Sequence, residues 1–426
     1  MKLHGSLNII GNDLYIGDIK ISDISNKFGT PCYIMDENLI RDNINRFKKS
    51  IGEGNRVVYA GKTFLNTHMV NILKDENVGL DVVSDGELYI AFNCGFDMKN
   101  IIFHGNNKSY DEIKMGVEFG VGRFVCDSED EILEIYKVSK KLNKKSKVFL
   151  RINPGIDAHT HDYIKTACID SKFGIYKDVD KILEILNKYN GCENLEIVGF
   201  HCHIGSQIFS KDAYIDEVDE IFGLMNEMKV YGFEFREVNL GGGFGIYYTK
   251  EDSPIGIEDI VKIILNRVYY NSNKFNLIIP RVYIEPGRSI TGNAGTTIYK
   301  VGIVKEIEGV RNYVSVDGGM TDNIRNALYN ANYECIIANK ASGSRDYRAR
   351  ISGKCCESGD VLINDTLIQI PEKGDILAIF STGAYCHSMS SNYNKITRAP
   401  VVFFYNNEVT LRSRRESLSD LIRLDI

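Results

Sequence analysis

The strongest constraint on the fold is an alternation of short apolar runs with longer amphipathic segments, from about residue 35 to residue 290. This alternation is typical of parallel βα units. The chain contains about eight such units, which is the number that closes a (β/α)₈ barrel. The predicted strands are residues 56–61, 79–83, 101–105, 123–127, 147–154, 196–205, 236–242 and 281–287.

Helical patterns separate these strands. In residues 65–77, 128–145 and 177–189 the apolar residues recur at spacings of three and four, as on one face of a helix. Asp127, Ser128 and Glu129 combine an N-cap side chain with first-turn acids, so they predict the start of a helix.

The pattern changes after Gly295. Residues 296–307, 311–319, 360–370, 375–385 and 401–413 alternate with a period of two, which predicts an antiparallel β domain, either a barrel or a sandwich. The first 34 residues read as strands and are expected to join it. The predicted domains are therefore a barrel over 35–290 and a β domain built from 1–34 and 291–426.

Composition excludes several classes of protein. At 426 residues, with 43% hydrophobic and 25% charged residues, the chain is typical of a soluble globular protein with two domains. Its net charge of −6 argues against a nucleic-acid surface, and no apolar stretch has the length of a membrane span or signal peptide. The ten cysteines show no repeating CxxC pattern, so we expect reduced thiols and a cytoplasmic protein.

Polar or glycine residues stand at nearly every predicted strand end. In chain order they are Lys62, Ser84 with Asp85, His104, Asp127, Asn153 with Pro154, His201 with His203, Gly241 to Gly243, and Glu285 with Arg288. Barrel enzymes place reactive groups at this C-terminal face, so the pattern predicts an active site there.

Lys62 closes an apolar strand and delivers a primary amine to that face. A desolvated amine loses its proton readily and can form a Schiff base. The alternative is a strand-ending lysine that extends into water.

The glycine run and Glu285 each have two interpretations. Gly241 to Gly243 lack the Lys and Ser/Thr of a P-loop, and they predict either an anion cradle or a tight turn. Glu285 beside Arg288 can be a simple ion pair. Pyridoxal phosphate, however, needs an amine for its aldehyde, an anion cradle for its phosphate and a carboxylate for its pyridine nitrogen. Lys62, the glycine run and Glu285 together meet these three requirements.

His201 and His203 are two residues apart and face the same way on a strand. Two imidazoles can bind a metal, as in barrel hydrolases, but no further set of ligand residues accompanies them. A histidine stacked on a planar cofactor is the second interpretation, and spacing does not decide which histidine stacks.

Ten motifs occur in the chain in one order. They are YAGK, GLDVVSDGEL, RINPGIDAHTHDYIKT, SKFG with GFHCHIGSQI, LGGGFG, EPGRSI, VDGGMTDNIR, CESGD and GAYCHSMSSNYN. In this order they resemble the diaminopimelate decarboxylase family, which belongs to the alanine-racemase-like (fold type III) pyridoxal-phosphate enzymes. The resemblance covers residues from about Gly29 to beyond Tyr393. It implies a (β/α)₈ barrel with a β domain, and a homodimer with composite active sites.

The resemblance also implies residue roles. Lys62 holds the cofactor covalently, His201 stacks on its ring and Glu285 pairs with its pyridine nitrogen. The other implied cofactor contacts are Ser206, Gly241, Gly242, Gly243, Gly287, Arg288 and Tyr385. The implied substrate contacts are Arg288, Arg325, Tyr329, Glu357 and Tyr385.

Cys356 is the implied proton donor, offered to the site by a partner subunit. A thiol protonates a carbanion when it is held close to it. An inert buried cysteine is the alternative, but the neighbouring Glu357, Ser358 and Asp360 argue against a core position. The implied reaction converts meso-2,6-diaminopimelate into L-lysine and CO₂, the last step of lysine biosynthesis.

Two positions depart from the family pattern. Asn326 stands where a proline usually follows the arginine, and Asp85 replaces a common glycine, so loop geometry is in question there. A relative that acts on ornithine, arginine or carboxynorspermidine is the nearest alternative. Arg325 argues against ornithine, whose terminal ammonium it would repel. A non-catalytic cofactor carrier would need neither Arg325 nor Cys356.

Overall fold

The computed structural model describes residues 1–155 and 171–426, so the RINPGIDAHTHDYIKT motif lies outside the described residues from position 156 onward. The chain divides into two compact units. The barrel unit consists of Ile44–Gly245 and Pro254–Gly287, and the β unit consists of Met1–Asn43, Ile246–Ser253 and Arg288–Ile426. The domain limits near residues 35 and 290 stay a prediction.

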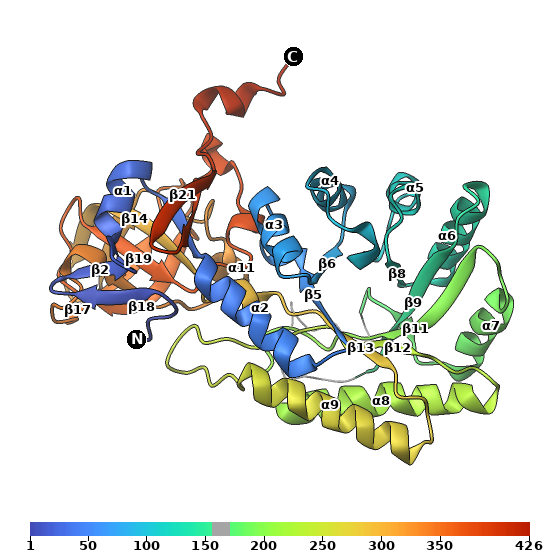
Figure 1. The fold of residues 1–426 in the computed structure, drawn as a ribbon. Helices are drawn as coiled ribbons and strands as arrows, with labels where there is room; N and C mark the ends of the chain where they lie inside the picture. The colour runs from blue at the N-terminus through green and yellow to red at the C-terminus, as the bar shows by residue number, and fades with distance from the viewer. Residues whose placement is uncertain (156–170) are drawn as a thin grey trace. The chain divides into compact units, whose positions relative to one another are not determined.

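Parallel strands close into a barrel in the barrel unit (Figure 1), as predicted. The order is β9-β11-β12-β13-β5-β6-β7-β8, and β8 pairs with β9 to close the ring; β10 is a short addition to β9. The strands are β5 (Arg56–Ala60), β6 (Gly79–Val82), β7 (Ile101–Phe103), β8 (Arg123–Cys126), β9 (Ser146–Asn153), β10 (Ile175–Tyr176), β11 (Leu195–His201), β12 (Glu237–Asn239) and β13 (Arg281–Ile284). Each predicted strand overlaps one of the barrel strands, because strands buried on both faces read as near-continuous apolar runs.

Helices follow the barrel strands (Figure 1). They are α3 (Thr67–Asp75), α4 (Asp85–Asn93), α5 (Tyr110–Phe119), α6 (Glu129–Lys141), α7 (Val179–Tyr189), α8 (Lys211–Val230) and α9 (Ile257–Lys274), while α2 (Glu37–Ile51) contains residues of both units. The predicted start at Ser128 is confirmed, because its side chain accepts a hydrogen bond from the backbone N–H of Glu131. The Ser84 side chain caps α4 in the same way.

The β unit contains a mixed sheet. Its main path is β18-β17-β15-β14-β4-β20-β21, and β19 pairs with both β14 and β16. The strands are β4 (Cys32–Asp36), β14 (Gly295–Ile307), β15 (Arg311–Val316), β16 (Cys335–Ile337), β17 (Tyr347–Ser352), β18 (Val361–Ile368), β19 (Ile376–Phe380), β20 (Val401–Tyr405) and β21 (Glu408–Ser413). Most pairs are antiparallel as expected, but β15–β17 and β4–β20 are parallel. Long connections join the strands of both pairs, which parallel pairing requires.

The N-terminal segment contributes a small sheet of its own. It contains β1 (Leu7–Ile10), β2 (Asp13–Ile16) and β3 (Ile19–Lys20), followed by α1 (Ile21–Phe28). Leu14 and Ile16 pack in one apolar cluster with Ile298 and Val402 of the mixed sheet. The first residues therefore belong to the core of the β unit. The unit also contains the short helices α10 (Arg288–Thr291) and α11 (Arg325–Tyr329).

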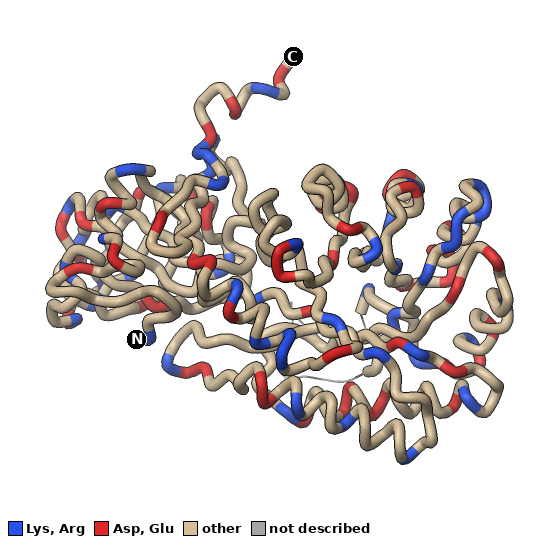
Figure 2. The backbone as a smooth tube through the Cα atoms, in the orientation of Figure 1, with Lys and Arg blue, Asp and Glu red and all other residues tan. Residues whose placement is uncertain are grey.

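The interior of the barrel is a packed core. Val58, Ile102, Val125, Phe149, Val198 and Tyr283 form one buried cluster. Along the chain, Lys and Arg alternate with Asp and Glu and no long region carries one sign (Figure 2). Among the described helices, none combines the length and apolar character that crossing a membrane requires.

Candidate active site

Three predicted site residues and the predicted glycine run stand at or just after the C-terminal ends of barrel strands. Lys62 lies in the short turn after β5, His201 ends β11, Glu285 follows β13, and the glycine run follows β12. The C-terminal ends of parallel barrel strands share one face, so residues far apart in the chain meet there. The contacts of Glu285 demonstrate that meeting.

Glu285 is a buried carboxylate with three donors around it. Its Oε1 atom lies 2.8 Å from Nε2 of His104 and accepts a hydrogen bond of 2.6 Å from Nδ2 of Asn239. Its Oε2 atom lies 3.3 Å from Nε2 of His201. Burial by itself would raise the pKa of Glu285, but the two histidines and their hydrogen bonds lower it well below the usual value. Glu285 is therefore ionised, and Oε2 retains capacity for a further donor.

The two predicted histidines, His201 and His203, make different contacts. Burial lowers the pKa of His201 to about 4, so its imidazole is neutral near pH 7, and its Nδ1 atom has no hydrogen-bond partner. Nδ1 of His203 instead lies 3.3 Å from the backbone nitrogen of Gly242 and accepts its hydrogen bond. His203 therefore supports the glycine turn, and the two imidazoles do not act as one pair of metal ligands.

The glycine run is a tight turn that only glycine fits. Gly241 and Gly243 have φ angles of +57° and +89°. A Cβ atom on Gly242 would lie 2.2 Å from the backbone oxygen of Glu285. The N–H of Gly241 already donates to Oδ1 of Asn239, at 3.0 Å, so two of the three predicted cradle amides have partners within the chain. The phosphate cradle stays a prediction.

Two further predicted cofactor contacts lie outside the glycine run. Ser206 is half-buried in the segment between β11 and α8. Gly287 is buried, and a Cβ atom there would lie 2.5 Å from Cγ2 of Thr63, directly after Lys62. The backbone at Gly287 therefore approaches the Lys62 turn closely.

Lys62 is exposed in the single chain, so a desolvated amine at this position stays a prediction. The turn carries the residue past the C-terminal end of β5. Its positive charge nevertheless acts on buried groups. Burial lowers the pKa of His203, and the Lys62 charge lowers it further. Burial raises the pKa of Asp81, and the charges of His104 and Lys62 oppose that rise.

Sequence reasoning missed the partners that orient Glu285. The sequence pattern predicts His104 only as a polar strand end and Asn239 only as part of the strand before the glycines. Each is a buried polar residue at the end of an apolar strand. Because buried polar groups in proteins are nearly always hydrogen-bonded, a polar residue in such a position indicates a buried partner. Asn239 bonds both Glu285 and Gly241, so it couples the carboxylate to the glycine turn.

The β unit contains a second group of predicted residues. Arg288 and Arg325 are buried, and both donate a hydrogen bond to the hydroxyl of Tyr248. Arg325 also donates to Tyr333, at 2.8 Å. The Tyr385 ring lies 4.8 Å from the guanidinium carbon of Arg288 and 5.8 Å from that of Arg325. The structure thus brings three predicted residues together and adds Tyr248 and Tyr333, which the sequence patterns did not indicate.

Tyr385 is held in an unusual backbone conformation. Its φ angle is +66°, which L residues with a side chain rarely adopt. Such positions concentrate at functional sites, where the surrounding structure holds them.

The other three predicted residues lie on α11 and in the loop that follows β17. Tyr329 is half-buried, four residues after Arg325 on α11. Cys356 and Glu357 are exposed in the loop between β17 and β18, whereas Cys355 is buried. The described hydrogen bond of Cys356 is from its backbone to Oδ1 of Asn394, at 2.8 Å, and not to the arginine cluster.

Comparisons with known proteins agree on one family. The pyridoxal-binding domain of the pyridoxal-dependent decarboxylases matches residues 37–292. The diaminopimelate decarboxylase of Bacillus subtilis is 44% identical over 100% of this chain and 98% of its own length. The crystal structure of the M. jannaschii diaminopimelate decarboxylase is 35% identical, with a TM-score of 0.93 over 99% of this chain and 98% of that one.

A second crystal structure of the M. jannaschii enzyme, in complex with L-lysine, has a TM-score of 0.92 over the same shares of the two chains. Identity and fold agree over essentially the whole length, and not only in the barrel. The chain therefore belongs to the pyridoxal-dependent decarboxylases and, within them, to the diaminopimelate decarboxylase family.

Proposed function

We propose that this chain removes CO₂ from meso-2,6-diaminopimelate and releases L-lysine, the last step of lysine biosynthesis, with pyridoxal phosphate as cofactor. The observation that carries the proposal is the ionised, buried carboxylate of Glu285, which His104 and Asn239 hold at the C-terminal face of the barrel. Membership of the diaminopimelate decarboxylase family supports the choice of substrate.

The residues present fit pyridoxal phosphate. Oε2 of Glu285 has capacity for an N–H donor such as a protonated pyridine nitrogen, and the glycine turn leaves no room for side chains. Lys62 would hold the cofactor covalently, His201 would lie against its ring, and the backbone of Gly241 to Gly243 would hold its phosphate. The remaining contacts would come from Ser206, Gly287, Arg288 and Tyr385. When bound, the cofactor accepts the electron pair that remains on Cα as CO₂ departs.

The ionised state of Glu285 is the chain's main contribution to this chemistry. A carboxylate keeps a pyridine nitrogen protonated, because the charge pair stabilises the proton. His104 and Asn239 occupy Oε1, whereas Oε2 has only the longer contact to His201, so Oε2 would be the oxygen available to the nitrogen.

Substrate recognition would use the arginine cluster. Guanidinium groups bind carboxylates bidentately, and Arg288 and Arg325 are buried with phenol hydroxyls as acceptors. Arg288, Arg325, Tyr329 and Tyr385 would orient the carboxylates, and Glu357 would bind an ammonium group.

Cys356 would deliver the proton to Cα, and we assign it to the active site of a second copy of this chain. Its exposure supports this assignment, because a thiol at the surface of one chain is available to another. The proposed assembly is a homodimer with composite sites. A reducing cytoplasmic location is supported by the nine described cysteines, all of which are free thiols.

The test is a lysine replacement read by spectrum and by product. Lys62→Ala should abolish the visible absorbance of the bound cofactor and the release of CO₂ from meso-diaminopimelate. Lys137→Ala, which removes an exposed lysine of α6, should leave both unchanged. Release of CO₂ from ornithine or arginine at a similar rate would contradict the proposed substrate.

A metal hydrolase is the second candidate, because one observation favours it. The ligand atoms of His104, His201 and Glu285 all lie within 4.8 Å of one another, a spacing that a metal ion accepts. Chelation followed by dialysis should leave decarboxylation intact. A stoichiometric metal in the purified protein, with activity lost on its removal, would favour the hydrolase instead.

A further inference from the structure

A pocket with a volume of about 290 Å³ lies at the N-terminal ends of the barrel strands, away from Glu285. Its lining includes Arg56, Lys99, Arg123 and Arg281, with Tyr283 on its apolar side. The predicted active site does not use any of these residues.

The strand period explains why the arginines gather there. Side chains two residues apart on a strand face the same way. Val58, Val125 and Tyr283 belong to the buried cluster inside the barrel. Arg56, Arg123 and Arg281 each stand two residues before one of them, near the starts of β5, β8 and β13. The guanidinium groups are therefore directed into the mouth of the barrel rather than outward from it.

Of the four cationic side chains in this lining, only that of Arg123 pairs with a carboxylate of the described chain. Nε and Nη2 of Arg123 donate to the two carboxylate oxygens of Glu237, both at 2.6 Å. Arg281 interacts with the Tyr283 hydroxyl, and Nη1 of Arg56 donates to the backbone oxygen of Asn55, at 3.2 Å. Within the described chain, the side chains of Arg56, Lys99 and Arg281 have no carboxylate partner.

We propose that this pocket binds a small anion with more than one negative charge, of the phosphate or polycarboxylate class. The lining contains no acidic residue, so with Glu237 counted the cluster has a net charge of about three positive units in a chain whose net charge is −6. Grouped cations repel one another unless an anion joins them. Guanidinium forks match phosphate and carboxylate oxygens, and the volume suits a small ligand.

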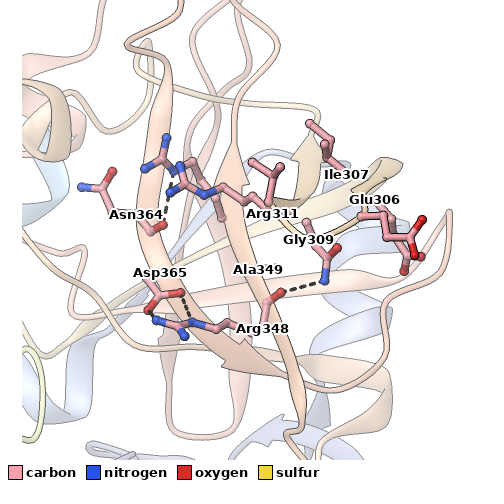
Figure 3. A pocket seen from close by; sticks show the side chains of 12 residues that line it. Glu306, Ile307, Gly309, Arg311, Arg348, Ala349, Asn364 and Asp365 are labelled. Atoms are coloured by element: carbon pink, nitrogen blue, oxygen red, sulfur yellow. Dashed lines mark hydrogen bonds and ion pairs between the residues drawn. The ribbon is translucent and has the colours of Figure 1, made fainter.

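A groove on the β unit provides the contrast (Figure 3). It also contains three arginines, Arg311, Arg348 and Arg350, but Glu306, Glu308 and Asp365 line it as well. Arg348 makes two hydrogen bonds to Asp365, at 2.8 and 2.7 Å. Positive and negative groups balance there, so arginine content alone does not distinguish the two places.

The experiment is calorimetric titration of the cofactor-loaded protein with inorganic phosphate and, separately, with citrate, at constant ionic strength. We expect saturable binding of at least one of them, with one site per chain, and the tighter of the two identifies the ligand class. Arg56→Gln and Lys99→Gln should each weaken binding by about tenfold, because each removes one charge-assisted contact. Arg311→Gln, in the groove of Figure 3, should leave the affinity unchanged.

Glu237→Gln tests whether one more unpaired positive charge raises the affinity for the anion. Removal of the carboxylate frees Arg123, so phosphate or citrate should bind more tightly, and misfolding does not produce a gain in affinity. Absence of saturable binding by both anions, or equal loss in Arg311→Gln and Arg56→Gln, would overturn the proposal. The assay reads binding and not CO₂ release, so its outcome is independent of the proposed decarboxylase activity.

Discussion

Nε2 of His104 lies 2.8 Å from Oε1 of Glu285, although 181 residues separate the two in the chain. The contact joins the end of β7 to the end of β13, and strands β5 and β6 lie between them in the barrel. Both side chains are buried, so the hydrogen bond is shielded from water. His104 thereby orients the carboxylate on which the proposed chemistry depends.

Replacement of His104 should therefore impair turnover more than substrate binding. A hydrogen bond to a charged group contributes about 1.5–3 kcal/mol, so we expect His104→Ala to lower kcat by about 10- to 100-fold with a small change in KM. His104→Gln places an amide nitrogen near the position of Nε2 and should recover much of the loss. Steady-state kinetics and the visible spectrum of the cofactor test this, and equal defects in the two variants would contradict it.

The hydroxyl of Tyr248 accepts hydrogen bonds from both Arg288 and Arg325. Tyr248→Phe should raise the KM for meso-diaminopimelate by about tenfold, since loss of one neutral acceptor for two charged donors costs on the order of 1–2 kcal/mol. Tyr333→Phe is the matched control, because Tyr333 contacts only Arg325 of the two arginines and should raise KM less. A larger effect in Tyr333→Phe would show that Tyr248 does not couple the arginines.

Glu217 on α8 is a buried acid outside the proposed mechanism. Burial raises its pKa from 4.5 to about 8, and its Oε1 atom has no hydrogen-bond partner. Between about pH 4.5 and about pH 8, the Glu217 carboxyl is therefore protonated in the folded protein but ionised in the unfolded chain. Stability should therefore fall as the pH rises from about 4.5 to about 8, by up to about 1.4 kcal/mol per pH unit.

Glu217→Gln removes that titration. We expect its thermal midpoint to exceed that of the unmodified protein at pH 8 and the difference to vanish near pH 4.5. The exposed Glu227, on the same helix, supplies the control, because Glu227→Gln should not change the pH dependence. The same difference at pH 5 and pH 8 would exclude a buried titrating carboxyl.

The glycine turn can be tested by adding one methyl group. In Gly242→Ala the new Cβ atom would lie 2.2 Å from the backbone oxygen of Glu285, so the turn must move and cofactor affinity should fall by at least about tenfold. Gly223→Ala adds the same group on α8 where, apart from the backbone of the helix itself and the adjoining residues, no atom lies within 4 Å. The control should be neutral or stabilise the helix by about 0.5–1 kcal/mol. Fluorescence titration with pyridoxal phosphate measures the affinities.

Local sequence patterns predict most of the strands and helices. Each barrel strand is a short apolar run, and each predicted helix repeats its apolar residues every three or four positions, so a few neighbouring residues suffice to identify either. Strands β16 and β17 were not predicted. The first is only three residues long, and Arg348 and Arg350 give the second a charged appearance because its outer side chains face water.

The sequence by itself determined the barrel, the mixed β unit and the strand ends that bear Lys62, His201 and Glu285, because strand period and chain order are local properties. Only the tertiary structure decided which groups meet. Closure of the barrel brings His104 and Asn239 to Glu285, and the fold of the β unit brings Tyr248 to Arg288 and Arg325. Such pairs depend on which strands and segments become neighbours in the folded chain. The pattern of a short stretch of sequence does not contain that information.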